Sequence, residues 1–89
     1  MVRRRINFVG RVQGVGFRAT ARRVALGLPV TGWVRNDPDG SVTAEVQGTA
    51  DALAAFLEGL RRAMTGHIRA IHESPMAVEP GESGFEIRR

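Results

Sequence analysis

The sequence predicts an α+β fold in which two helices cover one face of a mainly antiparallel sheet. Two observations lead to this prediction. Apolar residues recur at helical spacing in two separate stretches, residues 17–28 and 53–64. Around these stretches lie shorter runs in which apolar and polar residues alternate, as in strands with one buried face. The resulting order, βαββαβ plus a short terminal strand, is that of the ferredoxin-like α/β sandwich.

The first third of the chain predicts one strand and one helix. Ile6 to Val9 alternate as in a strand, and we expect the preceding arginines, residues 3–5, to form its solvated start. The apolar residues of the following helix share one face from Phe17 onward. Gly27 and Pro29 are expected to end that helix, since neither continues one well.

The middle of the chain predicts a hairpin followed by the second helix. Residues 30–36 and 41–47 read as strands, and the segment 36–40 between them is dense in turn-forming residues. Either Thr49 or Asp51 is expected to cap the start of the helix, because both side chains can accept a hydrogen bond from a free backbone N–H.

The last part of the chain gives weaker signals. Residues 68–71 and 76–78 read as two short strand segments, with Ser74-Pro75 expected to interrupt them. Residues 85–87 alternate again and predict a last short strand.

Composition sets the broad class of protein. The 89 residues, of which 43% are hydrophobic, are expected to form a single domain over residues 1–89. Without cysteine, the chain has neither a disulfide framework nor thiol chemistry. No apolar run is long enough to span a bilayer, and no signal peptide is visible. We therefore expect a cytoplasmic monomer with no membrane partner.

Charge is distributed unevenly along the chain. All 13 basic residues are arginine. Residues 1–35 contain no acid and carry a balance of +8, whereas residues 36–89 carry −4. The first third is thus suited to attract an anion, either a small phosphorylated molecule or a nucleic acid, and composition does not choose between them.

A glycine-containing loop connects the first strand to the first helix. Gly10, Gly14 and Gly16 precede Arg18, which lies at the predicted start of the helix. Backbone N–H groups at a helix start can bind an oxyanion, and a guanidinium adds a planar, charged pair of donors. The spacing matches neither a Walker loop nor a dinucleotide-binding motif. The alternative is an ordinary strand-to-helix turn followed by a surface arginine.

The predicted topology brings this loop close to a second polar residue. Two strands joined by a helical crossover run parallel, so their C-terminal ends lie at the same edge of the sheet. We therefore expect Arg18 and Asn36 to face the same small volume. The alternative for Asn36 is a residue that only initiates the hairpin turn.

Two segments of the chain resemble the acylphosphatase family nearly residue for residue. They are Gly-Arg-Val-Gln-Gly-Val-Gly-Phe-Arg at 10–18 and Gly-Trp-Val-Arg-Asn-Asp-Pro-Asp-Gly-Ser-Val at 32–42, and the ending 84–88 also fits. The resemblance implies a five-stranded ferredoxin-like sandwich that hydrolyses the carboxyl–phosphate bond of acyl phosphates without metal or cofactor. It further implies Arg18 and Asn36 as catalytic residues, and a phosphate-binding cradle whose members are Gln13, Gly14, Val15, Gly16, Phe17 and Arg18.

This chemistry is consistent with the residue types present. The carboxylate leaving group has a conjugate acid with a pKa of roughly 4 and departs without a general acid. Arg18 can offset phosphoryl charge, while the Asn36 amide can accept a hydrogen bond from the attacking water. Inorganic phosphate or sulfate should compete with the substrate. His67 and His72 have no cysteine beside them, and we expect no metal site.

A rival hypothesis is an RNA-binding module, because ferredoxin-like sheets also serve that purpose. Such sheets stack bases on exposed aromatic residues of their central strands. Residues 41–47 contain no aromatic residue, and Trp33 is expected to be a buried core residue, since a single aromatic does not make a surface on which bases stack. We therefore expect a small-molecule partner and no nucleic acid. Binding of a phosphorylated ligand without turnover remains a third possibility.

Overall fold

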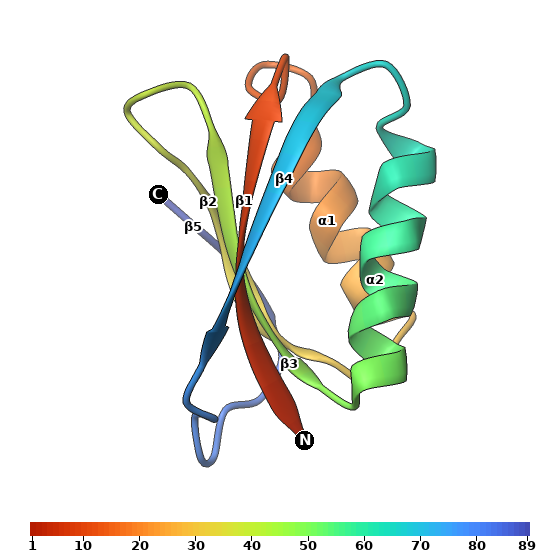
Figure 1. Ribbon diagram of the computed structural model, residues 1–89, viewed down its shortest axis with the longest axis vertical. Helices are drawn as coiled ribbons and strands as arrows, with labels where there is room; N and C mark the ends of the chain where they lie inside the picture. The colour runs from red at the N-terminus through yellow and green to blue at the C-terminus, as the bar shows by residue number, and fades with distance from the viewer.

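The computed structural model describes residues 1–89 as a five-stranded sheet with two helices on one face (Figure 1). The strand order is β4-β1-β3-β2-β5. This arrangement confirms the predicted fold class. Neither helix is long and apolar enough to cross a bilayer. The elements are β1 (Val2–Gly10), α1 (Phe17–Leu26), β2 (Thr31–Asn36), β3 (Val42–Gly48), α2 (Ala50–Ala63), β4 (Ile68–Met76) and β5 (Phe85–Arg88).

The hydrophobic core lies between the helices and the sheet. Each helix contributes its apolar stripe, and β1 and β3 contribute alternate residues. Two aromatic pairs connect the layers: Phe8 with Phe17, whose ring centroids are 5.0 Å apart, and Phe56 with Phe85, 5.8 Å apart. Burying one such side chain stabilises the fold by about 1.5–3 kcal/mol. The first pair also fixes the start of α1 against β1, next to the glycine-containing loop.

Both helices end or begin where local chemistry predicts. Helix α1 ends at Leu26, and Gly27 follows as its C-cap. Helix α2 is capped by Thr49, whose side-chain oxygen accepts a hydrogen bond of 3.1 Å from the Ala52 N–H. Of the two predicted capping residues, the structure therefore selects Thr49. Asp51 lies in the first turn, where its negative charge is favourable near the helix N-terminus.

The topology gathers three strand ends at one edge of the sheet. Strands β1 and β2 both pair antiparallel with β3, so they run parallel to each other as predicted. Strand β5 pairs in parallel with β2, with Arg35 opposite Arg88. The ends of β1, β2 and β5 therefore point the same way, toward the upper part of Figure 1.

Strand β4 differs from the prediction. It runs without interruption from Ile68 to Met76, through Ser74 and Pro75, so the predicted break is wrong. The reason is that β4 is an edge strand, paired only with β1. A proline is tolerated in an edge strand because one side of that strand needs no hydrogen-bond partner.

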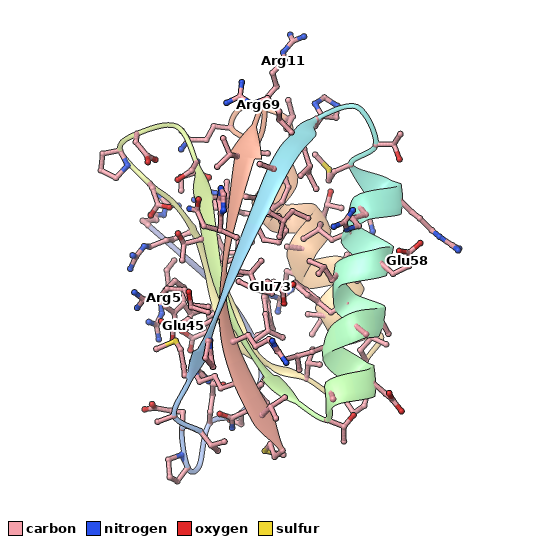
Figure 2. All side chains as sticks on the ribbon, viewed as in Figure 1. Arg5, Arg11, Glu45, Glu58, Arg69 and Glu73 are labelled. Carbon is pink, nitrogen blue, oxygen red and sulfur yellow. The ribbon has the colours of Figure 1, made fainter.

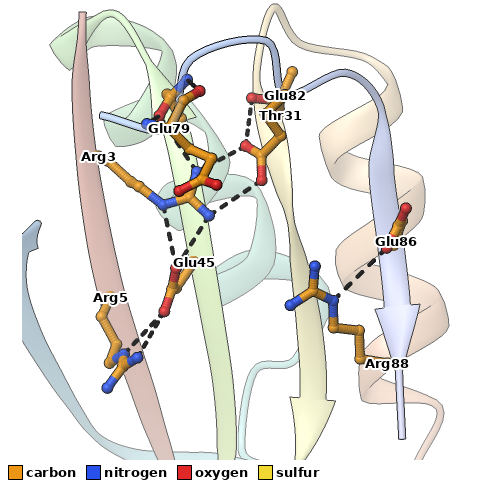
Figure 3. A network of polar contacts seen from close by, with 9 residues as sticks. Arg3, Arg5, Thr31, Glu45, Glu79, Glu82, Glu86 and Arg88 are labelled. Carbon is orange, nitrogen blue, oxygen red and sulfur yellow. Dashed lines mark hydrogen bonds and ion pairs between the residues drawn. The ribbon is translucent and has the colours of Figure 1, made fainter. Parts of the chain in front are cut away.

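The prediction that the arginine triplet is solvated is wrong for Arg3, which is only 4% exposed. Figure 3 shows its guanidinium on the helix-free face of the sheet, between Glu45 of β3 and Glu82 of the segment before β5. That segment, residues 77–84, crosses the sheet face and covers Arg3. A contact between residues 79 positions apart leaves no trace in local periodicity.

Trp33 is buried, as expected, but it does not belong to the core between sheet and helices. The guanidinium carbons of Arg35 and Arg88 lie 5.0 and 4.7 Å from the centroid of its ring. Both contacts are within the range of cation–π attraction. The one tryptophan of this sheet is thus occupied by the protein's own arginines.

Candidate functional site

A cavity of about 270 Å³ opens at the edge where β1, β2 and β5 end. It combines Val12, Gly14 and Gly16 of the loop after β1 with the first turn of α1 and the ends of β2 and β5. Arg18 and Asn36 both contribute to its wall, which confirms that the two predicted residues face the same volume. The lining residues are Val12, Gly14, Gly16, Phe17, Arg18, Ala19, Asn36, Ile87 and Arg89.

Two glycines determine the course of the 11–16 loop. Gly14 and Gly16 both have φ of 76°, in the left-handed region that strains other L-residues. No atom lies within 4 Å of where their Cβ atoms would be, so glycine is required for backbone rotation rather than for space. Gly16 then begins α1 directly, with no intervening capping side chain.

The start of α1 is open to an anion. No side chain caps it, and its first turn contains no acidic residue. The first N–H groups of a helix have no partner within the helix, and the helix dipole adds positive potential around them. This end of α1 therefore offers unpaired donors to the cavity, as helix N-termini that bind phosphate do.

Arg18 is half-buried at this helix start, and no carboxylate pairs with it. Its only hydrogen bond within the protein runs from Nη1 to the backbone carbonyl of Arg88, at 3.4 Å. That bond comes from β5 and steadies the guanidinium without neutralising it. The positive charge of Arg18 is therefore available to a ligand in the cavity.

Asn36 ends β2 and is half-buried, and its side chain forms no hydrogen bond within the protein. The hairpin turn is made by its neighbours instead. The Gly40 N–H donates to the Asp37 carbonyl at 3.1 Å, and the Ser41 N–H donates to Asp39 Oδ1 at 2.9 Å. The reading of Asn36 as the turn-initiating side chain is therefore not supported.

The two aspartates beside Asn36 are engaged by the hairpin. Burial tends to raise the pKa of Asp37, but hydrogen bonds from Thr43, Arg35 and Ser41 outweigh it and hold the pKa below its ordinary value. The side-chain and backbone donors of Ser41 likewise lower the pKa of Asp39. Neither aspartate lines the cavity. Both are held as anions inside the turn, which leaves them poorly suited to accept a proton from a bound water.

The predicted cradle residues divide into two groups. Gln13 and Val15 do not line the cavity, whereas Gly14, Gly16, Phe17 and Arg18 do. The Gln13 side chain instead donates to the carbonyls of Asp37 and Ser41, at 2.7 and 2.9 Å. It thereby ties the loop to the β2–β3 hairpin and fixes the distance between the two sides of the site. The Val15 side chain is 37% exposed to solvent.

Sequence reasoning missed the contribution of β5. Ile87 and Arg89 line the cavity, and the Arg88 carbonyl holds Arg18. The alternation at 85–87 predicted a strand but not its neighbour. Only the parallel pairing with β2 reveals that its end joins the same edge.

The fold and the cavity together define a ferredoxin-like sandwich with a site suited to an oxyanion at one sheet edge. The family model for acylphosphatase matches residues 4–87. The chain belongs to the acylphosphatase family. This result confirms the resemblance inferred from the motifs and, with it, the hydrolase class.

Individual relatives agree over nearly the whole chain. An acylphosphatase of Nitratidesulfovibrio vulgaris is 44% identical over 91 residues, covering 99% of this chain and 91% of that protein. One of Salinibacter ruber is 43% identical, covering 90% and 85%. The crystal structure of acylphosphatase from Bacillus subtilis superposes with a TM-score of 0.91 at 32% identity, covering 100% of both chains. The structure of an acylphosphatase from Coxiella burnetii superposes with a TM-score of 0.86 at 30% identity, covering 98% of this chain and 92% of that one.

Proposed function

We propose that the cavity is the site at which this chain hydrolyses the carboxyl–phosphate bond of acyl phosphates, with Arg18 and Asn36 as the catalytic residues. One observation carries the proposal. A half-buried arginine without a carboxylate partner and an asparagine without any partner share a cavity beside an uncapped helix start. Membership of the acylphosphatase family supports the reaction class.

The phosphoryl group would be held by the backbone N–H groups of residues 13–18 and by the Arg18 guanidinium. The uncapped, acid-free start of α1 supports this role. So does the availability of the Arg18 charge, because a guanidinium matches two phosphoryl oxygens and offsets charge on them as the bond breaks. The left-handed glycines let the backbone itself approach the ligand.

Asn36 would hold the attacking water through its side-chain oxygen, which has no competing partner in the protein. The water oxygen attacks phosphorus, the bond from phosphorus to the carboxyl oxygen breaks, and its electron pair leaves with the carboxylate. The proton of the water passes to a phosphoryl oxygen. Because Asp37 and Asp39 are bound within the hairpin, no side-chain base is invoked.

The carboxylate leaves without protonation, so the proposed mechanism assigns no step to a metal or cofactor. Inorganic phosphate and sulfate should bind in the same place and compete with the substrate. That the active unit is a monomer stays a prediction. A cytoplasmic location stays a prediction.

Turnover of benzoyl phosphate by purified protein in the presence of excess chelator tests this proposal. We expect release of benzoate and phosphate by the wild type. Arg18→Gln should lower the rate by ~30- to 1000-fold, since loss of a charge-assisted contact to the transition state costs on the order of 2–4 kcal/mol. Arg18→Lys should recover little of the rate, because an ammonium lacks the planar pair of donors.

Arg23→Gln is the matched control. Arg23 lies on the same helix, is exposed, and makes no side-chain contact that the substitution would remove. Native activity in Arg18→Gln, or activity that chelator abolishes and one divalent ion restores, would contradict the proposed mechanism. Phosphate binding by a wild type that does not hydrolyse benzoyl phosphate would indicate a binding protein instead.

A further inference from the structure

A β-bulge changes the direction of one side chain near the start of β4. Val9 pairs with Ala70 and Gly10 pairs with Ile68, so Arg69 has no partner across the ladder. Two isoleucines show the effect, because Ile68 and Ile71 both pack against the core although they are three positions apart. An odd spacing puts residues on opposite faces of a regular strand. The bulge restores both isoleucines to the core and leaves Arg69 exposed.

Backbone contacts hold Arg11 beside this bulge. The Arg11 N–H donates to the His67 carbonyl at 2.9 Å, and His67 Nδ1 lies 3.2 Å from the Arg11 carbonyl oxygen. The two segments approach so closely that a Cβ on Gly10 would lie 2.2 Å from the His67 oxygen. The position of Arg11 relative to β4 is therefore set by a backbone hydrogen bond, by the close approach at Gly10 and by the His67 ring.

Arg11 and Arg69 share a second cavity of about 450 Å³ with the α2–β4 turn. Figure 2 shows both arginines at the same end of the sheet. Neither guanidinium forms an ion pair or a side-chain hydrogen bond within the protein, and no carboxylate lines the cavity. Its wall consists of Gly10, Arg11, Gly66, His67, Ile68 and Arg69.

We propose that this second cavity, the Arg11–Arg69 site, binds the phosphate or another oxyanion group of a small molecule. Both side chains carry a positive charge that no carboxylate of the cavity pairs with, and a bound oxyanion would supply the missing counter-charge. Guanidinium groups also supply the planar donors that oxyanions accept. The cavity shares no lining residue with the cavity that contains Arg18 and Asn36. Gly10 and Arg11, which line the Arg11–Arg69 site, directly precede the loop residues Val12, Gly14 and Gly16, which line the other cavity.

The features of the cavity favour a small ligand over a nucleic acid. No aromatic side chain lines it, so it offers no surface on which bases could stack. A small surface cavity lined by two arginines and one histidine suits a single anionic group better than a continuous phosphate backbone.

Titration of the ¹⁵N-labelled protein with inorganic phosphate, followed by amide chemical shifts, tests the proposal. In the wild type we expect two sets of responding amides, one at residues 13–18 and one at residues 66–69. Arg18→Gln should weaken only the first set. The double variant Arg11→Gln/Arg69→Gln should weaken phosphate binding at the second set by on the order of tenfold or more, because two charge-assisted contacts are lost.

Arg23→Gln/Arg61→Gln removes the same charge from exposed positions outside the cavity and serves as the matched control. It should preserve both sets, and the Arg11/Arg69 variant should still hydrolyse benzoyl phosphate. Three outcomes would overturn the proposal: no response at residues 66–69, an equal response in the Arg11/Arg69 variant, or loss of that response in the control. Oligothymidylate that binds these residues where inorganic phosphate does not would overturn the assignment to a small ligand.

Discussion

Two polar regions of this protein use their arginines in opposite ways. On the helix-free face, the Arg3 cluster comprises Arg3, Arg5, Glu45 and Glu82. There the Arg3 guanidinium donates to both carboxylates, at 3.0 Å to Glu45 and 2.7 Å to Glu82. In the cavity that contains Arg18 and Asn36, Arg18 makes a single hydrogen bond of 3.4 Å to a backbone carbonyl. Arg3 is thus paired with carboxylates of the protein, whereas Arg18 has no carboxylate partner.

The helix starts repeat the same contrast. Helix α2 has a capping threonine and an acid in its first turn, whereas α1 has neither. Throughout the protein, no buried side-chain nitrogen or oxygen lacks a partner. In the cavity that contains Arg18 and Asn36, by contrast, neither the Arg18 charge nor the Asn36 amide is paired with a side chain of the protein. We expect substitutions in the Arg3 cluster or at the α2 cap to change stability. Substitutions in the cavity that contains Arg18 and Asn36 should change activity.

Arg3→Met should give the largest change in stability. It leaves two carboxylates with less compensation in a buried setting, and breaking such an arrangement costs about 3–5 kcal/mol. Arg5→Met removes another partner of Glu45, but the Arg5 side chain is 50% exposed. An exposed ion pair is worth only about 0–1 kcal/mol, which makes Arg5→Met the matched control. Denaturant unfolding measures the free energy of unfolding of both variants. Equal losses in Arg3→Met and Arg5→Met would contradict this prediction.

The same cluster should make wild-type stability sensitive to acid. Burial tends to raise the pKa of Glu45 and of Glu82, but hydrogen bonds outweigh it and hold each pKa below its ordinary value. Because each folded-state pKa is lowered, the stabilisation is complete above the unfolded value of roughly 4.3 and is lost as pH falls through the folded value. Arg3→Met should therefore lose less stability than the wild type over that acidic range, as unfolding at a series of pH values would show.

Asn36→Ala should give the next largest change, in activity. If Asn36 positions the attacking water, kcat should fall by about 100-fold, the effect of misplacing a reacting group, with little change in KM or phosphate affinity. A side chain without protein partners should contribute little to the melting temperature. Kinetics and thermal unfolding of one purified variant measure all three quantities. A variant that turns over normally would remove Asn36 from the mechanism.

Phosphate or sulfate should stabilise the wild type against heat by a smaller amount. A ligand at ten times its Kd stabilises the folded state by about 1.4 kcal/mol. Arg18→Gln should shift this stabilisation to higher anion concentration, and either anion should inhibit benzoyl phosphate hydrolysis competitively. Noncompetitive inhibition would show that the inhibiting anion binds elsewhere, the Arg11–Arg69 site being the candidate.

Thr49→Ala should give the smallest effect and confine it to stability. Loss of an N-cap hydrogen bond costs about 1 kcal/mol. Thr49 does not line the cavity that contains Arg18 and Asn36, so kcat should be unchanged. Thermal unfolding and a benzoyl phosphate assay of the same variant measure both quantities. A lower kcat at an unchanged melting temperature would contradict the expectation that the start of α2 affects stability only.

Much of this structure could be predicted because it depends on local pattern. Helical spacing predicts α1 and α2, and the crossover rule places Arg18 and Asn36 at one edge of the sheet. Turn chemistry predicted the hairpin after Asn36, although the turn itself is made by Asp37 and Asp39.

The remaining features depend on contacts between distant segments. Burial of Arg3 requires residues 77–84 to cross the sheet face, and no periodicity in either segment encodes that crossing. Continuity of β4 through Pro75 depends on its being an edge strand, which is a property of the sheet rather than of β4. Ile87 and Arg89 line the cavity that contains Arg18 and Asn36 only because β5 pairs with β2. The four residues of β5 do not specify that pairing by themselves.

The hydrogen bond between Arg18 and the Arg88 carbonyl spans 70 positions of sequence, so the position of Arg18 in the cavity depends on the docking of β5. Closing so long a loop costs chain entropy that only the assembled sheet repays. Intermediates in which β5 is still undocked would contain the glycine loop and Asn36 but would hold Arg18 less firmly. Under the proposed mechanism, recovery of hydrolysis during refolding should therefore follow the docking of β5 on β2.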